Sequence, residues 1–475
     1  MKHLKALFAI ALVAFFAAPA FAETQNVKVS GSMDAYWFYH SEYDLADSND
    51  QSALPAGGTA QSQSHTGNLN YRSDADSYFR SNTQVEVSAD LTDNVSTVIN
   101  VVNQRDWNAD TWDSSTGVGP NTTADEFDID LDLAYVQMKE IFYSPLTLTI
   151  GRQDLWFGRG FIIGNNSRAW DANGDTLDDM YSVTTAFDAV RATLDFAPWT
   201  LDFVYANITE NSQNAEDDID LWIANINYKF AEYNAVAEGY IASELDRATL
   251  STVANSGTQL NATHTLGGRA QFDPISQITL GGEVAYQFGG YHTTTNGRDR
   301  DAWAADLFGT YRWDNAWKPE LTLEYVYFSG EENLSTSTSD SYGAWNPMYR
   351  GKFWTAYADF REFVYATADS VDDPATTNQS FIQVKGAMKP LEDLLLEASF
   401  TYLWTTEDIH NTKADIHTAT RDSNIGWEVD LQATYDYTED VSFGILAAWF
   451  IPGDFYVSPE DQTATDIVSS VKVSF

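Results

Sequence analysis

The chain has 475 residues, with 26 Lys and Arg against 69 Asp and Glu, so its formal net charge is −43. Such an acidic chain disfavours nucleic acid and anionic surfaces as partners, because both need basic patches. It contains no Cys, so no disulfide framework holds it together. After Ala22 no apolar run approaches the ~18 residues of a membrane-spanning helix, which excludes helical membrane proteins.

The N-terminus has the pattern of a secretory signal peptide. Lys2 and Lys5 form a basic head, and an apolar run follows from residue 6 to residue 18. Ala20-Phe21-Ala22 has the small residues of a cleavage site. We therefore expect residues 1–22 to be removed and residues 23–475 to form one domain.

The remainder alternates apolar and polar residues with a period of two, in segments of roughly ten to fourteen residues, which indicates β-strands. We count eighteen segments, joined alternately by short and long connections. The short ones lie near Asp93, Ser144-Pro145, Ala197-Pro198, Ala231-Glu232, Asp273-Pro274, 315–319, Lys389-Pro390 and 438–440. The long ones are 41–76, 107–126, 158–183, 209–217, 245–261, 290–300, 331–378, 406–423 and 452–465.

This order of connections is typical of outer-membrane barrels, which have short periplasmic turns and long extracellular loops. We predict an all-β fold: a transmembrane antiparallel up-and-down β-barrel of eighteen strands, wide enough for an aqueous channel unless loops plug it. Residues 353–366 are also apolar enough for a strand, which would give an odd count. We place them in the seventh long loop, folded into the mouth of the barrel; a further strand is the alternative.

The two faces of the predicted strands differ. In segment 426–436, Trp427, Val429, Leu431 and Tyr435 alternate with Glu428 and Asp430. A sheet in lipid must be closed and apolar outside, but its inside can be polar. We therefore place the first set against lipid and the acids in a water-filled lumen. The same reasoning places Phe127, Ile129, Leu131 and Leu133 against lipid, with Asp128, Asp130 and Asp132 inside.

Several stretches together resemble the alginate export family of outer-membrane barrels. They are LTIGRQDLWFGRGFIIGNN (148–166), FDAVRATLDF (187–196), YGAWNPMYRGKFWTAYADF (342–360), and Gly426, Glu428 and Asp430 with PGDF (452–455). The chain also ends on Phe475, similar to the signal read by the barrel assembly machinery. The resemblance implies a passive conduit for a secreted anionic polysaccharide, lined by basic residues and a few acids.

The residues that match such a lining are candidates for substrate binding in the pore. Those expected to point inward from the strands are Arg80, Arg152, Arg191, Arg269, Arg312 and Lys385, with the acids Asp154, Glu428 and Asp430; Arg159 and Arg168 lie in the third long loop. The predicted lumen carries more acids than bases, which opposes a polyanion unless the bases form a continuous track. A structural alternative is that Arg152 only neutralises an acid such as Asp195 or Asp132.

Two other functions therefore stay open beside the conduit for an anionic polysaccharide or related solute. One is a general or cation-leaning porin for small solutes, and the other is a plugged barrel that binds a partner. Asp171, Asn173 and Asp175 suggest a weak calcium site, but Gly174 is misplaced for an EF-hand, so a solvated acidic loop is favoured.

We predict no enzyme activity and no cofactor, since no residue spacing indicates a nucleophile or a zinc site. A hydrolase at the rim of the barrel is the remaining alternative. The expected location is the bacterial outer membrane. The expected partners are outer-membrane lipid, the assembly machinery and the solute, without nucleic acid, and we expect a monomer.

Overall fold

The computed structural model describes residues 26–42, 45, 75–107, 129–166, 181–210, 218–231, 234–247, 260–292, 297–331, 341–356, 377–407, 422–455 and 462–475. The predicted signal peptide lies outside these residues. Within them, no helix has both the length and the apolar character needed to cross a bilayer.

Eighteen antiparallel strands form one sheet in the described part of the chain. They are β1 (Asn26–Ser41), β2 (Ala75–Thr92), β3 (Val95–Asp106), β4 (Asp130–Met138), β5 (Leu146–Gln153), β6 (Phe187–Phe196), β7 (Trp199–Thr209), β8 (Ile219–Phe230), β9 (Ala235–Asp246), β10 (Asn261–Ile275), β11 (Ile278–His292), β12 (Gly297–Arg312), β13 (Glu320–Phe328), β14 (Gln379–Leu391), β15 (Leu394–Thr405), β16 (Asn424–Asp436), β17 (Val441–Pro452) and β18 (Ala464–Ser474). A 3-10 turn, η2 (Ile141–Tyr143), joins β4 to β5.

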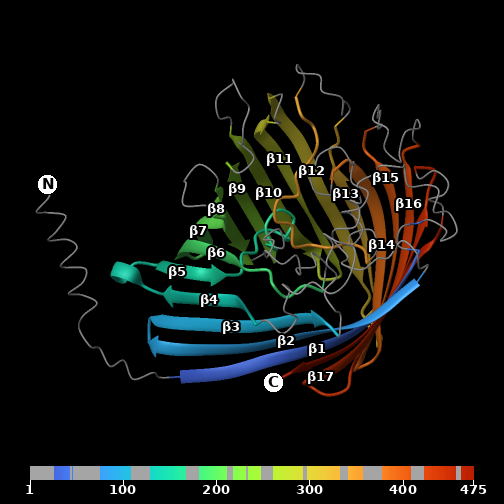
Figure 1. Ribbon diagram of the computed structural model, residues 1–475, viewed down its shortest axis with the longest axis horizontal. Coiled ribbons are helices and arrows are strands. Elements are labelled where there is room, and N and C mark those ends of the chain that lie inside the picture. The colour runs from blue at the N-terminus through green and yellow to red at the C-terminus, as the bar shows by residue number, and fades with distance from the viewer. Residues whose placement is uncertain are drawn as a thin grey trace, which may run out of the picture.

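The sheet closes on itself because β18 pairs with β1. Ser32 lies opposite Ser474, and the register continues to Ser41 opposite Thr465. The backbones of Gly31 and Phe475 exchange two hydrogen bonds of 2.9 and 3.0 Å at this closure. Each strand otherwise pairs with its sequence neighbours, which confirms the predicted up-and-down barrel (Figure 1).

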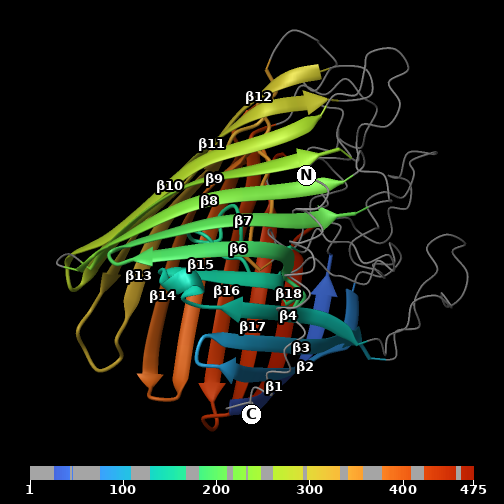
Figure 2. The same ribbon diagram turned by 90° about the vertical axis from the view of Figure 1, so that its left-hand side faces the viewer.

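The connections follow the predicted order. Tight turns such as β6–β7 and β14–β15 gather at one end of the barrel, and the strand ends that lead into long connections lie at the other (Figure 2). The first and last strands begin and end at the short-turn end, which corresponds to the periplasmic side.

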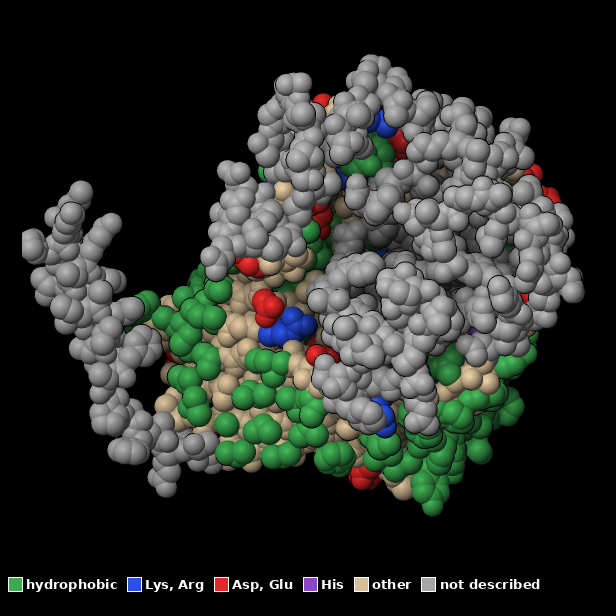
Figure 3. Space-filling view, in the orientation of Figure 1, with side chains coloured by type: hydrophobic (Ala, Val, Ile, Leu, Met, Phe, Trp, Pro, Cys, Tyr) green, Lys and Arg blue, Asp and Glu red, His purple; other side chains and the backbone are tan. Residues whose placement is uncertain are grey.

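The outer face of the wall is apolar. Trp427, Leu431 and Tyr435 are exposed on β16, whereas Glu428 and Asp430 of the same strand are buried, as the alternation predicts. Rows of hydrophobic side chains likewise cover the exposed face of β1 to β5 (Figure 3). In lipid this register is strongly fixed, because a charge at mid-bilayer on the outer face costs about 2–4 kcal/mol.

Leu133 departs from the predicted orientation. The pairing of β3 with β4 shifts between Asn100 and Val101, so that Asn100 lies opposite Leu133 and Val101 opposite Leu131. This β-bulge adds a residue on β4 and turns Leu133 to the inner face with the buried Asn100. Leu131 stays exposed on the outer face.

The seventh long connection runs from β13 to β14. Its residues 353–356 form no strand, which agrees with their placement in a loop; residues 357–366 lie outside the described part of the chain. The described residues 341–356 lie within the barrel, as the next section shows.

Candidate functional site

Two loop segments fold into the lumen and pair with each other. We call them the inner layer: residues 154–166 after β5 and residues 341–356 after β13, whose traces run inside the ring of strands (Figure 1). Ile163 and Tyr349 form a parallel bridge. The Gly164 N–H donates to the Tyr349 carbonyl at 2.7 Å, and the Gly351 N–H donates to the Gly160 carbonyl at 2.8 Å. The two segments therefore form one hydrogen-bonded unit.

Aromatic side chains hold the inner layer against the wall. The Phe161 ring stacks on Phe328 of β13 with centroids 5.6 Å apart and lies 6.1 Å from the ring of Trp345. Trp354 makes edge contacts with Phe161 and with Phe381 of β14 at 6.2 and 5.5 Å. All of these rings are buried, and each fully buried aromatic side chain contributes about 1.5–3 kcal/mol or more.

The wall accommodates this packing because its inner face is apolar where the inner layer lies. Buried inward residues that form the core with the two segments are Phe187, Val204, Ala206, Leu221, Ile223, Ala242, Ala285, Ala302, Ala304, Val326, Phe328 and Phe381. Strands with apolar residues on both faces are buried on both sides. Runs such as FVYA (203–206) and LWIA (221–224) carried that signal in the sequence.

Two wall carboxylates bind the backbone of the inner layer at its deepest turn. The Gly158 N–H donates to Glu238 Oε1 and the Arg159 N–H to Glu283 Oε2, both at 3.0 Å. The Tyr240 hydroxyl donates to Glu283 Oε1 at 2.6 Å. Each carboxylate therefore accepts hydrogen bonds from donors in fixed positions, and these bonds offset the free-energy cost of burying its charge.

Glycine is required at the turn itself. Gly158 has φ +60°, and a Cβ placed on it would lie 2.6 Å from both carboxylate oxygens of Glu283. Both the left-handed backbone and the close approach of Glu283 disfavour a larger residue. Gly158 therefore lets the wall carboxylate reach the turn.

A compact ion cluster joins the inner layer to β12 and β13. Arg159 Nη1 lies 2.9 Å from Asp306 Oδ2 and 3.1 Å from Glu324 Oε1. Lys352 Nζ lies 2.9 Å from Asp306 Oδ2 and also contacts Glu324. The Trp354 indole N–H donates to Glu324 at 3.2 Å, and the Arg159 guanidinium lies 3.8 Å from the centre of the Phe308 ring. Two cations thus meet two anions, so the cluster is neutral.

Most bases that the sequence predicted for the lumen have carboxylate partners. Arg191 Nη2 lies 2.8 Å from Asp202, and Arg269 Nη1 lies 3.6 Å from Glu238 and donates to the Gly158 carbonyl at 3.1 Å. The other two pairs, nearer the periplasmic end, are Arg312–Glu320 at 3.3 Å and Lys385–Glu397 at 2.9 Å. Of these bases, Arg159 belongs to the inner layer and Arg269 contacts it from the wall. The others pair with carboxylates of the wall.

Arg80 has a different environment. Its side chain is buried, with the guanidinium 5.3 and 5.7 Å from the ring centres of Phe38 and Tyr78. It lies opposite Tyr36 of β1, on the inner face. Cation–π contacts of this kind contribute about 0.5–2 kcal/mol, so Arg80 belongs to the packing between β1 and β2.

Arg152 lies on the outer face of the wall, in contrast to the predicted lumenal position. It pairs across the strands with Ala134 and Asp188, and its guanidinium lies 3.5 Å from the Asp188 carboxylate. Arg152 is two residues after Ile150, an exposed residue of the lipid face, so the alternation itself assigns it to that face. Asp188 is its ion-pair partner, and its charge also interacts with the carboxylates of Asp132 and Asp154. Asp154 follows β5 in the inner layer and is exposed.

The two acids predicted on β16 lie in the lumenal wall, away from the ion cluster. Glu428 is buried opposite Thr401, and Asp430 accepts a hydrogen bond of 2.8 Å from the Ser399 hydroxyl. Arg168 and the calcium candidates Asp171, Asn173 and Asp175 lie outside the described residues. Within those residues, no group of three or more acids or histidines is placed to hold a metal ion.

Sequence reasoning missed Glu238, Glu283, Asp306 and Lys352, which organise the site together with Glu324. All four acids lie on inward positions next to buried apolar residues of the same face, such as Tyr240, Ala285, Ala304 and Val326, and an acid in such a position was the available signal. Their partners are far away in sequence; Arg159 and Asp306 are 147 residues apart.

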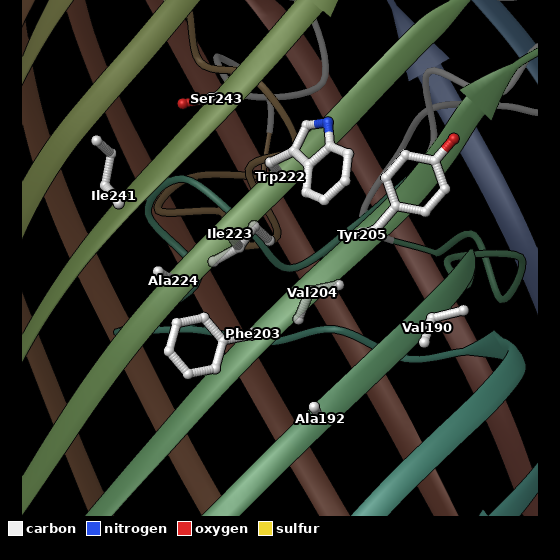
Figure 4. A pocket seen from close by; sticks show the side chains of 10 residues that line it. All are labelled: Val190, Ala192, Phe203, Val204, Tyr205, Trp222, Ile223, Ala224, Ile241 and Ser243. Carbon is white, nitrogen blue, oxygen red and sulfur yellow. The ribbon is translucent and has the colours of Figure 1, made fainter.

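A shallow pocket lies on β6 to β9, on the side of the wall that faces away from the lumen. Its lining includes Phe203, Tyr205, Trp222 and Ile241, which project from the outer side of β7 to β9, while the inner layer is visible behind the strands (Figure 4). Phe203, Trp222 and Ile241 are exposed on the face that contacts lipid. The pocket is therefore a depression in the lipid-facing surface.

A closed barrel with an apolar outer belt, and with charged groups and infolded segments in its lumen, defines a channel protein of the bacterial outer membrane. Known structures share this fold. One is Pseudomonas aeruginosa OpdO, with a TM-score of 0.55 and 10% sequence identity; the match covers 95% of this chain and 98% of that chain. P. aeruginosa OccK8 (OprE) has a TM-score of 0.52 and 12% identity, with the same coverage of 95% and 98%. P. aeruginosa OccK2 (OpdF) in complex with glucuronate has a TM-score of 0.52 and 11% identity, again covering 95% and 98%.

The chain belongs to the alginate export family, whose model matches residues 57–470. No curated protein matches it. Family and fold are those of channel proteins.

Proposed function

We propose that the protein is a passive channel for small polar solutes, with a weak preference for cations over anions. The observation that supports this is the pairing of the lumenal bases. Arg159, Arg191, Arg269, Arg312 and Lys385 each face at least one carboxylate. A paired base presents little net positive potential to a passing solute.

Carboxylates also remain beyond those pairs. In addition to the carboxylates of these ion pairs, the inner wall carries Glu283, which accepts hydrogen bonds from the Arg159 N–H and the Tyr240 hydroxyl, and Glu428 and Asp430 on β16. Rings of acids favour cations in pores. The net potential of the described lumen is therefore expected to be negative.

Passage of an anionic polysaccharide is the second candidate, and family membership favours it. In addition, P. aeruginosa OccK2, which shares the fold, has been solved with bound glucuronate, a sugar acid of the kind that such a polymer contains. Under this alternative, Arg159, Arg191 and Arg269 would exchange their carboxylate partners for those of the solute.

Reversal potentials decide between the two candidates. The full-length protein is inserted into planar lipid bilayers with a tenfold KCl gradient. A reversal potential whose sign shows that K⁺ is more permeant than Cl⁻ supports the proposal. The opposite sign, with Cl⁻ more permeant, overturns it in favour of the sugar-acid conduit. Conductance near zero would overturn both and favour a plugged barrel that binds a partner.

A further inference from the structure

One large aromatic side chain of the inner layer is exposed although it lies inside the barrel. Trp156 has a relative exposure of 53%, whereas its neighbours Leu155 and Phe157 are at 1% and 5%. Buried and exposed side chains alternate from Gln153 to Phe157, so successive side chains point to opposite sides of the segment. Leu155 and Phe157 pack into the core with the wall, and Trp156 therefore points away from the wall, into the lumen.

Three glycines support the indole from behind. A Cβ placed on Gly160 would lie 2.3 Å from Trp156 Cζ2, one on Gly164 would lie 2.9 Å from Cε3, and one on Gly351 would lie 2.7 Å from Cζ3. The six-membered ring therefore rests on bare backbone from both segments of the inner layer. Gly164 and Gly351 are themselves joined through Tyr349 and Gly160, so the support is rigid.

Trp156 differs from the exposed tryptophans of the lipid face in what covers its ring. Trp222 and Trp303 are exposed to the same degree, 52% and 53%, but they lie on the outer wall, where lipid covers them. Trp156 leaves its apolar surface in the water of the lumen, which is unfavourable unless something binds there.

An acidic residue precedes the ring in the chain. Asp154 and Trp156 are both exposed, and exposed and buried side chains alternate from Gln153 to Phe157, so the two lie on the same, solvent-facing side of the segment. The Asp154 carboxylate also accepts a hydrogen bond of 3.5 Å from the Thr185 hydroxyl. A flat aromatic surface and an adjacent carboxylate match a pyranose ring, whose C–H face stacks on the π system while its hydroxyls donate to the carboxylate.

We infer that Trp156 is a stacking platform for the sugar rings of neutral saccharides that pass through the lumen, with Asp154 accepting hydrogen bonds from their hydroxyls. This inference deepens the proposed function and rests on it, since it names the class of polar solute. A carboxylate beside the platform disfavours sugar acids, so neutral sugars bind more strongly than uronates of equal length.

The test is blockade of ion current through the full-length protein by maltohexaose in planar bilayers. We expect Trp156→Ala to weaken the association constant of maltohexaose about tenfold, and Trp156→Phe to retain most of it. Trp303→Ala is the matched control, because it removes an equally exposed indole from the lipid face, and it should leave blockade unchanged. Polyethylene glycol of similar mass has no ring to stack, so the parent and Trp156→Ala should respond to it alike.

Two further comparisons complete the test. A trimer of galacturonate should block the ion current of the parent less than maltotriose does. In Asp154→Asn, the difference between the association constants of the two trimers should be smaller. Equal maltohexaose blockade of the parent and Trp156→Ala, or a conducting parent that maltohexaose does not block, would overturn the inference.

If the parent does not conduct, the proposed function fails, and the platform is then tested alone by calorimetry in an amine-oxide detergent. Maltohexaose binding that is lost in Trp156→Ala would support the platform, and absence of binding to the parent would overturn it.

Discussion

Ion pairs in this barrel are of two kinds, and they differ in what they join. The pairs of Arg159 and Lys352 with Asp306 and Glu324 connect the inner layer to the wall, and the side chains are 0–18% exposed. The pairs Arg312–Glu320 and Lys385–Glu397 connect neighbouring strands, and both bases are 47% exposed.

The difference in burial decides what each kind contributes. An exposed pair is worth about 0–1 kcal/mol, because water screens it. A buried pair contributes little net stability when intact, but removing one partner leaves a desolvated charge and costs about 3–5 kcal/mol. The exposed pairs between strands therefore set the electrostatic potential of the lumen, and the buried pairs fix the position of the inner layer.

The largest expected effect follows from breaking the buried cluster. Asp306→Ala leaves Arg159 and Lys352 with one carboxylate between them, so undocking of the inner layer should become easier by about 3–5 kcal/mol. Hydrogen–deuterium exchange of residues 154–166 and 341–356 should accelerate, and single-channel conductance should rise. Glu320→Ala, in the exposed pair, is the control and should leave the exchange rates unchanged. Unchanged exchange in Asp306→Ala would contradict the assigned role.

A somewhat smaller effect is expected at the deep turn. Gly158→Ala forces a Cβ into a left-handed residue and against Glu283, which should weaken docking by about 1–3 kcal/mol. The readout is the same exchange experiment, with Gly239→Ala as control, because a Cβ there meets its nearest atom only at 3.7 Å. Similar exchange rates in the two variants would show that the turn tolerates a side chain.

The alternation of residues predicted the strands, their order and the orientation of Glu428 and Asp430, because a lipid outside and water inside determine which residue types each face accepts. It failed at Leu133, where a bulge inserts a residue without any change in composition. The docking of the inner layer could be predicted only in part. Residues 353–366 were predicted to fold into the mouth of the barrel, and the described part, 353–356, does lie inside the barrel. The contacts of Arg159 with β12 and β13, however, depend on a fold formed by residues far apart in sequence.

The exposed pairs should change selectivity more than stability. Lys385→Gln leaves Glu397 without its partner 2.9 Å away, so the lumen becomes more negative and the reversal potential should shift toward cations. Urea unfolding of the barrel in lipid vesicles should change by no more than about 1 kcal/mol. A shift toward anions would contradict a lumenal position for Lys385.

The smallest effect is expected at Arg152. Its pair with the exposed Asp188 lies on the outer face, so Arg152→Gln should leave the reversal potential unchanged and alter stability by about 0–1 kcal/mol. A shift as large as that of Lys385→Gln would place Arg152 in the lumen after all and contradict the strand register of β5.

The inner layer also has a mechanical consequence. Its segment 154–166 leaves the wall after β5 and binds side chains of β9, β11, β12 and β13, so it connects distant parts of the wall through the lumen. Strands that are braced from within resist flattening when the surrounding bilayer is compressed, because changing the cross-section would require the buried cluster to come apart. Lateral tension in the membrane should therefore deform the arc between β5 and β13 least.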